Sequence, residues 1–394
     1  MALALLVIFP LGWIGWFYPW DDLYDRSGTP VGGDFPVYYV LGKLTAEGRT
    51  GELYDLAAQQ REMRAVLPGL PKNSFLPALY PPYVATALSP LGRLSYPVAY
   101  GVFFAASLAL LAGAAWTWRK TLPLASATWA GTALLAGAAL PVLWESLIGG
   151  QASPLAMFVF AAAAALALGN RPLAAGAILA LAAYKPNVLA LVGLGLIVRF
   201  PRLLVGAAPA GLALLALAWG TLGKDVCLEY LKVPGSPEGR RALAAPPKHK
   251  FHGLAAAMPA TRNDQARIAF FGICAAGAIV VAWRWRQAPG NAAAAYYALA
   301  LLGLLQLLGN PYVPTYDLLL LLPTGVFAAA ALYVDRTSPP LGAAAVQGLL
   351  ALAFFGPHFS QAIALETGWQ PFAYCLLPVI WLLARRFISA TRRA

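Results

Sequence analysis

Long apolar runs recur from one end of this chain to the other, and arginines and lysines mark where many of them end. A helix needs about 20 apolar residues to cross a bilayer. In this chain 60% of the 394 residues are hydrophobic and only 11% are charged. A β-barrel would instead show short alternating strands, which the sequence lacks. The sequence therefore predicts an all-α polytopic membrane protein, forming a single integral-membrane domain over residues 1–394.

Turns and charged residues divide the chain into about 12 candidate transmembrane helices. They are 2–18, 96–118, 122–141, 152–169, 171–184, 186–199, 202–220, 265–283, 292–309, 314–333, 340–356 and 370–387. The first lacks a basic start and a cleavage site, so we interpret it as a retained span rather than a removed signal. Segment 81–94 is short and contains three prolines, which favours a re-entrant or interfacial segment.

The distribution of charge supports this arrangement. With the amino terminus in the cytoplasm, the inner loops carry twelve of the 28 basic residues but only one of the 16 acids, Asp335. Inner loops of membrane proteins are rich in lysine and arginine, so both termini are predicted to be cytoplasmic. The net charge of +12 thus reflects arginines at helix ends, and we expect no nucleic-acid partner.

Two long loops, 19–80 and 221–264, are predicted on the outer side. In the first loop, apolar residues recur at helical spacing in two stretches separated by Gly48 and Gly51. This pattern indicates two amphipathic helices that lie along the membrane surface. Their polar faces are predicted to carry Lys43, Glu47, Gln59, Arg61 and Arg64.

Asp34 stands at the start of the first of these helices, within GGDFPVYYVLGK. Aspartate at such a position often caps the helix by accepting a backbone N–H, and Pro36 suits the first turn. A carboxylate at a membrane surface is also suited to act as a general base. The two roles are compatible, and the residues alone leave both open.

Further short motifs follow in order along the chain. They are Gly51-Glu-Leu-Tyr-Asp55, Tyr80-Pro-Pro, Leu88-Ser-Pro-Leu91, Gly150-Gln151, Lys185-Pro186 and Asn310-Pro-Tyr with Tyr316-Asp317. Together with Asp34, Val37, Tyr38 and Tyr39, their order and spacing over about residues 30–335 resemble glycosyltransferase family 87. That family comprises polyprenol-phosphate-mannose-dependent mannosyltransferases and their relatives, which belong to the GT-C class of integral-membrane glycosyltransferases.

The resemblance implies a GT-C-like fold and a polyprenyl-phosphate sugar as donor. It implies inverting transfer of a mannose-like hexose to a lipid or glycan acceptor, at the outer face of the bacterial cytoplasmic (inner) membrane. Asp34 would be the catalytic base, framed by the two surface helices.

Cations must hold the donor phosphate, because negative charge develops there as the sugar leaves. Lys185 is the first candidate, since it interrupts an apolar run where a lysine is costly. It could instead extend toward the lipid headgroups. His249 and Lys250 belong to a basic cluster in the second long loop, which could bind phosphate or remain solvated.

Several other residues are candidates for contacts with substrate. Asp317 could pair with Lys185, contact sugar hydroxyls, or simply stabilise a helix start. Gln151 could contact a hydroxyl or cap a helix junction, and aromatic residues are common at membrane interfaces in any case. The full set is Tyr38, Tyr80, Gln151, Asn310, Tyr316 and Asp317.

Only three histidines are present, and no ligand set for a metal stands out, so no cofactor is predicted. A cation held by Asp34 and a second carboxylate remains open. Two other functions also remain open: a transporter or flippase of a lipid-linked sugar, and a non-catalytic subunit of an envelope-polymer assembly system. A transporter would favour internal repeats with matching broken helices, and no convincing repeat is present.

Overall fold

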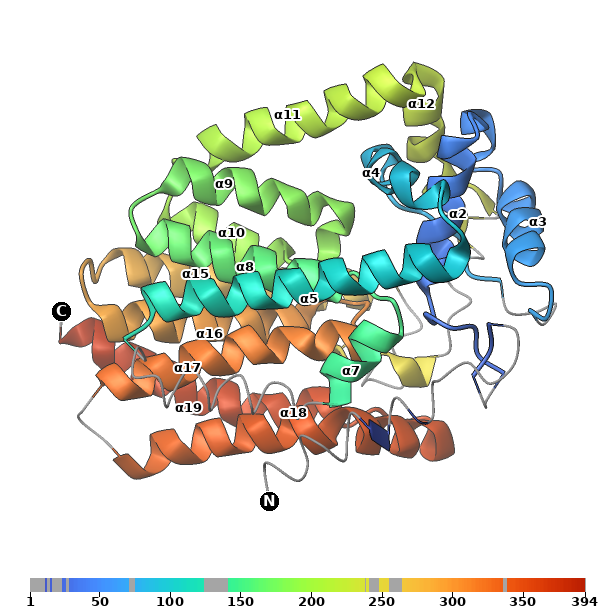
Figure 1. Cartoon of the computed structure of the whole chain (residues 1–394). Helices are drawn as coiled ribbons and strands as arrows, with labels where there is room; N and C mark the ends of the chain where they lie inside the picture. The colour runs from blue at the N-terminus through green and yellow to red at the C-terminus, as the bar shows by residue number, and fades with distance from the viewer. Residues whose placement is uncertain are drawn as a thin grey trace.

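A computed structural model of the chain describes residues 11–12, 15, 23–25, 28–70, 75–123, 141–237, 239–240, 248–254, 264–335 and 339–393. Within these ranges every regular element is a helix, apart from two isolated β-bridges. Figure 1 shows long helices side by side in one bundle, with α2, α3, α4 and α12 at one end and the carboxyl terminus at the other. The predicted all-helical fold is therefore confirmed for this part of the chain.

The bundle is built around α16, which is buried along nearly its whole length. A helix that is apolar on every side belongs inside a bundle. By contrast, α5, α11 and α15 leave large apolar side chains exposed on their outer faces, as expected of helices that contact lipid. The bundle helices are α5 (Tyr96–Thr121), α8 (Ser153–Leu168), α9 (Pro172–Ala180), α10 (Ala190–Arg199), α11 (Leu203–Leu222), α15 (Asp264–Arg286), α16 (Ala292–Gly309), α17 (Leu321–Val334), α18 (Pro339–Thr367) and α19 (Phe372–Arg392).

Among the described residues, six helices are long and apolar enough to cross a membrane, which supports a membrane protein. A seventh span is obtained if α7 (Pro141–Ile148) and α8, which meet at a bend of 119°, are counted as one. The predicted spans 2–18 and 122–141 lie almost entirely outside the described residues. Segments 171–184 and 186–199 form shorter apolar helices. The count of twelve therefore stays a prediction.

One predicted boundary is wrong. The span 340–356 was predicted to end before Pro357, but α18 continues through that proline to Thr367. A proline inside a helix removes one backbone hydrogen bond without necessarily ending the helix. The loop between α18 and α19 is therefore much shorter than predicted.

The first long loop, 19–80, forms α2 (Phe35–Ala46), η1 (Thr50–Glu52) and α3 (Leu56–Val66), where two surface helices were predicted. The prediction of an amphipathic helix is confirmed for α3 but wrong for α2, which is buried on nearly all sides. Gln59 is also buried, and its side chain bonds to the backbone of Leu53 and Ala78.

A short helix, α4 (Pro82–Gly92), covers α2. Glycines permit this close crossing, because a Cβ atom on Gly42 would meet the backbone of Leu88 and one on Gly92 would meet that of Gly42. Segment 81–94, which was predicted to be re-entrant or interfacial, thus forms α4. Because α4 packs on α2, that side of α2 faces protein rather than the membrane surface.

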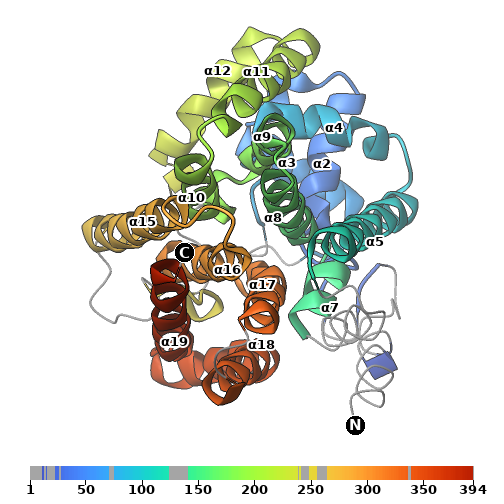
Figure 2. The same ribbon diagram turned by 90° about the vertical axis from the view of Figure 1, so that its left-hand side faces the viewer.

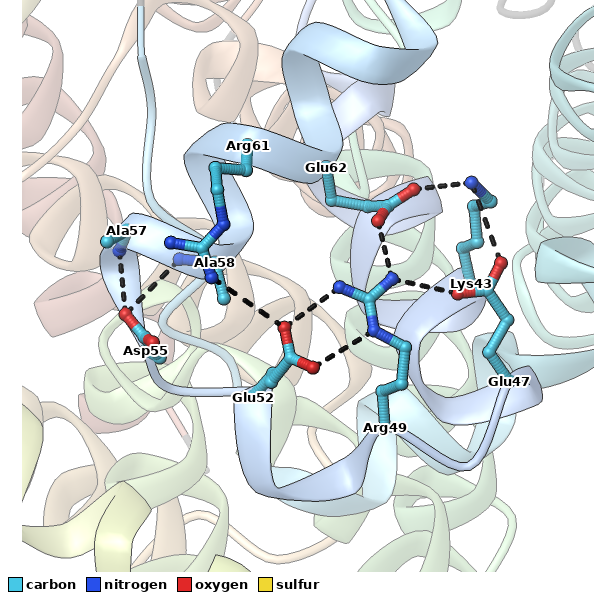
Figure 3. Close-up of polar contacts among 9 residues, drawn as sticks. All are labelled: Lys43, Glu47, Arg49, Glu52, Asp55, Ala57, Ala58, Arg61 and Glu62. Carbon is cyan, nitrogen blue, oxygen red and sulfur yellow. Dashed lines mark hydrogen bonds and ion pairs between the residues drawn. The ribbon is translucent and has the colours of Figure 1, made fainter.

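Arg49 holds the turn between α2 and α3 through three carboxylates (Figure 3). Its guanidinium donates to Glu47 (2.9 Å), to both oxygens of Glu52 (3.0 and 2.8 Å) and to Glu62 (2.6 Å). Lys43 donates to Glu62 as well. Burial opposes the charge of Glu62, but the bonds from Lys43 and Arg49 prevail and lower its pKa. This network fixes how α3 leaves α2.

The second long loop packs against the first. Its helix α12 (Lys224–Lys232) follows α11 directly, and the ring of Tyr230 lies 5.5 Å from that of Tyr54. Val226 and Val233 join the apolar cluster formed by α2 and the segment before α4. The two long loops therefore form one cap over the same end of the bundle.

Candidate functional site

Two glycine turns bring Asp34 and Gln151 together. Gly32, Gly33 and Gly150 all have positive φ (+84°, +51° and +58°), a conformation that favours glycine. A Cβ atom on Gly150 would meet the Gly32 carbonyl oxygen, and one on Gly33 would lie 2.9 Å from the backbone of Gly149. The backbone N–H of Asp34 donates to the Gly149 carbonyl oxygen (3.0 Å). The turns thus contact each other backbone to backbone.

Gln151 Nε2 donates to Asp34 Oδ2 over 2.6 Å. The carboxyl of Asp34 makes no capping hydrogen bond to α2, so the interpretation of Asp34 as a helix cap is wrong. In the same loop, Asp55 does cap a helix, since it accepts from the backbone N–H groups of Ala57 and Ala58 at the start of α3. The direction of the Asp34 carboxyl is therefore set by Gln151.

The surroundings of Asp34 shift the pKa of its carboxyl in both directions. Burial raises its pKa, and this effect exceeds the opposing effects of the Gln151 hydrogen bond and of the charges on Lys250 and Lys185. The residue still keeps some exposed surface. A raised pKa makes the carboxylate a stronger base, and the remaining exposure leaves it accessible to a reactant.

A second cluster lies where a helix breaks. After α9 and η2 (Leu181–Tyr184), Lys185 adopts an extended backbone before Pro186, and its ammonium forms an ion pair with Asp317. Asp317 is 2% exposed and also accepts from Ser153 Oγ (2.8 Å). The predicted pairing of Lys185 with Asp317 is confirmed. It joins two segments 132 residues apart in the chain.

Lys185 keeps capacity for a further ligand. Its side chain is 21% exposed, and its Nζ lies 5.2 Å from the centre of the Tyr316 ring. An ammonium has three protons to donate, of which Asp317 takes one. An anion near Tyr316 could therefore accept from the others.

Tyrosines lie between the two clusters. The hydroxyls of Tyr38 and Tyr80 are 2.8 Å apart, and their ring centres are 4.9 Å apart. Burial, together with the charges of Asp34 and Asp317, raises the pKa of Tyr80. Burial likewise raises the pKa of Tyr38. Both hydroxyls therefore stay protonated at neutral pH. One proton is shared within the pair, which leaves one that can be donated to a ligand.

The candidates from the second long loop differ in their placement. Lys250 is exposed and acts electrostatically on Asp34, and none of the acids whose positions are described lies within ion-pair distance of it. His249 contributes a backbone contact, in which its carbonyl accepts from Gln370 Nε2 (3.2 Å). Lys250 is thus the better placed of the two to meet an anion.

Asn310 is held within the protein. It is 2% exposed, and its Oδ1 accepts from Asn187 Nδ2 and from the Tyr312 backbone N–H, both at 3.1 Å. Gln306 bonds in turn to the carbonyl of Asn187 and the N–H of Leu191. These bonds satisfy backbone groups exposed by the break after Tyr184. The contacts of Asn310 thus support the position of Lys185.

Sequence reasoning missed Glu145 and Ser153. Glu145 lies on α7, one turn before Gly149, and its charge interacts with those of Asp34 and Lys250. Its position within the apolar run PVLWESLI was a usable signal, since an acid there is as unusual as Lys185. Ser153 had no such signal, because a serine at a helix start is common. No group of three or more His, Cys, Asp or Glu side chains in the described ranges could hold a metal ion.

Comparison with known proteins gives one match. The family model for glycosyltransferase family 87 matches residues 78–311, more than half of the chain. The chain belongs to glycosyltransferase family 87. No curated protein and no solved structure matches it.

Membership of glycosyltransferase family 87, together with the candidate spans, identifies a membrane glycosyltransferase. The matched segment includes Tyr80, Gln151, Lys185 and Lys250 but ends before Asp317 and begins after Asp34. The fold nevertheless brings these two acids close to residues within the match. The candidate site is therefore assembled from the matched segment and from both of its flanks.

Proposed function

We propose that this glycosyltransferase moves a mannose-like hexose from a polyprenyl-phosphate sugar to a lipid or glycan acceptor. The observation that carries the proposal is the position of Asp34, a partly exposed carboxylate aimed by Gln151 and flanked by Lys185 and Lys250. Transfer from a sugar phosphate needs a base for the acceptor proton and positive charge for the departing phosphate, and these three residues can supply both. The family match supports an enzyme over a flippase or a non-catalytic subunit.

In the proposed reaction, an acceptor hydroxyl oxygen attacks the anomeric carbon from the face opposite the phosphate. The bond from that carbon to the phosphate oxygen breaks, and the polyprenyl phosphate leaves with the electron pair. Asp34 takes the hydroxyl proton. A single displacement inverts the anomeric configuration.

The departing phosphate would be held by Lys250 and by the free protons of Lys185. The free proton of the Tyr38–Tyr80 hydroxyl pair would be donated to an oxygen of the sugar or phosphate, with Asp317 keeping Lys185 in place. Further parts of the proposal are a GT-C-like fold of about twelve spans, cytoplasmic termini, and a site facing the outer side of the bacterial inner membrane. The charge distribution of the sequence supports this orientation.

The test is transfer of labelled sugar from synthetic polyprenyl-phosphate sugars by the purified protein in lipid, with identification of the product. We expect Asp34→Asn to insert and fold normally, because the asparagine oxygen can still accept from Gln151. We expect the same variant to lose at least about 100-fold in rate, because an amide cannot act as a base.

Asp55→Asn is a matched control in the same loop. Asparagine caps a helix about as well as aspartate, so this variant should transfer sugar at close to the wild-type rate. Normal transfer by Asp34→Asn would show that Asp34 is not the base. Absence of transfer from every polyprenyl-phosphate donor, with nucleotide sugars accepted instead, would overturn the donor class.

A further inference from the structure

A cluster of arginines that form no ion pair with any described residue lies at the end of the bundle opposite Asp34. Arg199 ends α10, Arg202 precedes α11, and Arg284 and Arg286 lie in the last turn of α15. Figure 2 looks at this end of the molecule, and there α10 lies beside α15. The charges of Arg199 and Arg286 are close enough to repel each other.

Arg199 is the most constrained member. The centre of its guanidinium lies 4.5 Å from the Phe200 ring centre and 5.4 Å from that of Trp285, which is itself 2% exposed. Its Nε is buried, and no acceptor among the described residues bonds to it. Aromatic faces attract a cation but leave its N–H groups without acceptors. Within the described ranges, this guanidinium therefore has no counter-charge.

The chain supplies no acid to this cluster in the part that the structure describes. Asp335, the one acid of the predicted inner loops, is bonded to Arg393 and Tyr297. The nearest acid along α15 is Asp264 at its far end, about 33 Å away at the usual helical rise. Helix dipoles favour arginines at the ends of α10 and α15, but Arg202 stands at the start of α11, where the dipole is unfavourable to a cation.

We propose that this arginine cluster binds the phosphate headgroup of an anionic phospholipid. The guanidinium forks match phosphate oxygens in geometry and charge. Apolar side chains lie close to the arginines in sequence and stay exposed: Trp283 (54%), Leu204 (51%) and Val205 (64%). These side chains can contact the acyl chains of the same lipid, which is why the ligand is a phospholipid rather than free phosphate.

The test uses the full chain in nanodiscs of phosphatidylcholine, with and without phosphatidylglycerol. Native mass spectrometry counts retained phosphatidylglycerol, and thermal unfolding gives the stability. We expect the wild-type protein to retain phosphatidylglycerol and to unfold at a higher temperature when it is present. Arg199→Gln should weaken this binding by at least about tenfold, because it removes a charge-assisted contact.

Arg119→Gln is the matched control, since Arg119 is an exposed arginine at the end of α5. It should keep the affinity for phosphatidylglycerol within about twofold. In phosphatidylcholine alone, Arg199→Gln should be at least as stable as wild type, because it removes a partly buried charge with no acidic partner in the described part of the chain. That result separates loss of a ligand from loss of a structural contact.

Three results would overturn the proposal. Equal losses of phosphatidylglycerol binding in Arg199→Gln and Arg119→Gln would show that the lipid is attracted by positive charge in general and not by this cluster. Full stabilisation by millimolar inorganic phosphate in phosphatidylcholine would show a site for free anions. Lower stability of Arg199→Gln in phosphatidylcholine, with unchanged retention of phosphatidylglycerol, would show that Arg199 only packs.

Discussion

Gln151 bonds directly to Asp34, and this contact couples the turn between α7 and α8 to the proposed base. The hydrogen bond lowers the pKa of Asp34 against the larger effect of burial. Removing it in Gln151→Ala should raise that pKa further. The protonated acid cannot accept a proton, so the rate of transfer falls as the pH drops through the pKa. The acid limb of the pH profile should therefore move to higher pH.

The measurement is kcat/KM for sugar transfer across pH, for wild type and Gln151→Ala. Gln287→Ala is the control, because Gln287 is exposed after α15, at the opposite end of the bundle. Its profile should match that of wild type. An acid limb that stays in place or moves to lower pH in Gln151→Ala would contradict the assigned coupling.

Lys185 combines a structural and a proposed functional role, and a double substitution separates them. Lys185→Met leaves Asp317 buried without its cation, which typically costs about 3 kcal/mol of stability. Lys185→Met with Asp317→Asn removes both charges and should recover most of that loss. Neither variant should recover donor use, because the cation for the phosphate is missing in both.

Unfolding in denaturant reports the stability of the two variants, and KM for the donor reports its use. Ser153 can still donate to the asparagine oxygen in the double variant. If the double variant regains both stability and transfer, Lys185 serves only to neutralise Asp317.

At the level of residues, the sequence identifies unusual groups better than their partners. Asp34, Lys185 and Asp317 stand out because charge is rare in so apolar a chain. The partners are 117 residues away for Asp34 and 132 residues away for Lys185. Only the packing of distant segments determines such pairs, which is also why the capping role of Asp34 looked equally reasonable.

Among the elements, the crossing of α2 and α4 sets the position of Asp34. A methyl group on Gly42 would overlap the Leu88 carbonyl, and relief requires α2 and α4 to separate. Gly42→Ala should therefore destabilise the protein by about 1–3 kcal/mol, the usual range for overpacking. Because Asp34 immediately precedes α2, sugar transfer should decrease as well.

Gly101→Ala provides the comparison for this effect. Gly101 lies within α5, and a Cβ atom there would meet nothing within 4 Å. Alanine favours a helix over glycine, so this variant should be unchanged or slightly more stable. Thermal unfolding of both variants measures the difference. Equal unfolding temperatures for Gly42→Ala and Gly101→Ala would mean that the crossing of α2 and α4 tolerates an added methyl group.

The same crossing explains what the sequence could and could not predict about elements. The spacing of Leu56, Met63 and Leu67 predicts α3 well, because one face of that helix remains exposed. The pattern in α2 also fits an amphipathic helix, yet α4 covers its other side. Whether a polar-looking face meets water or another helix depends on tertiary packing, which periodicity does not report.

The whole molecule has two chemically different ends. The end with α2, α3, α4 and α12 carries Asp34 and the charge network of Figure 3, whereas the opposite end carries the arginine cluster around Arg199. The sequence alone predicted this difference in charge between the two ends, because lysines and arginines gather in every second loop between the predicted spans. The sequence did not show that the family match would leave out part of the candidate site. Asp34 and Asp317 both lie outside residues 78–311.

The two ends should be accessible from opposite sides of the membrane. Arg61 is exposed on α3, and Gln287 is exposed at the end of α15. We expect a membrane-impermeant maleimide to label Arg61→Cys in intact cells and Gln287→Cys only after the membrane is disrupted, because the arginine-rich end should be cytoplasmic. Both variants are made in a chain in which Cys227, Cys274 and Cys375 are replaced, and that background should stay unlabelled. Labelling of Gln287→Cys but not Arg61→Cys in intact cells would reverse the orientation and place the proposed site on the cytoplasmic side, where a polyprenyl donor of the outer leaflet could not reach it.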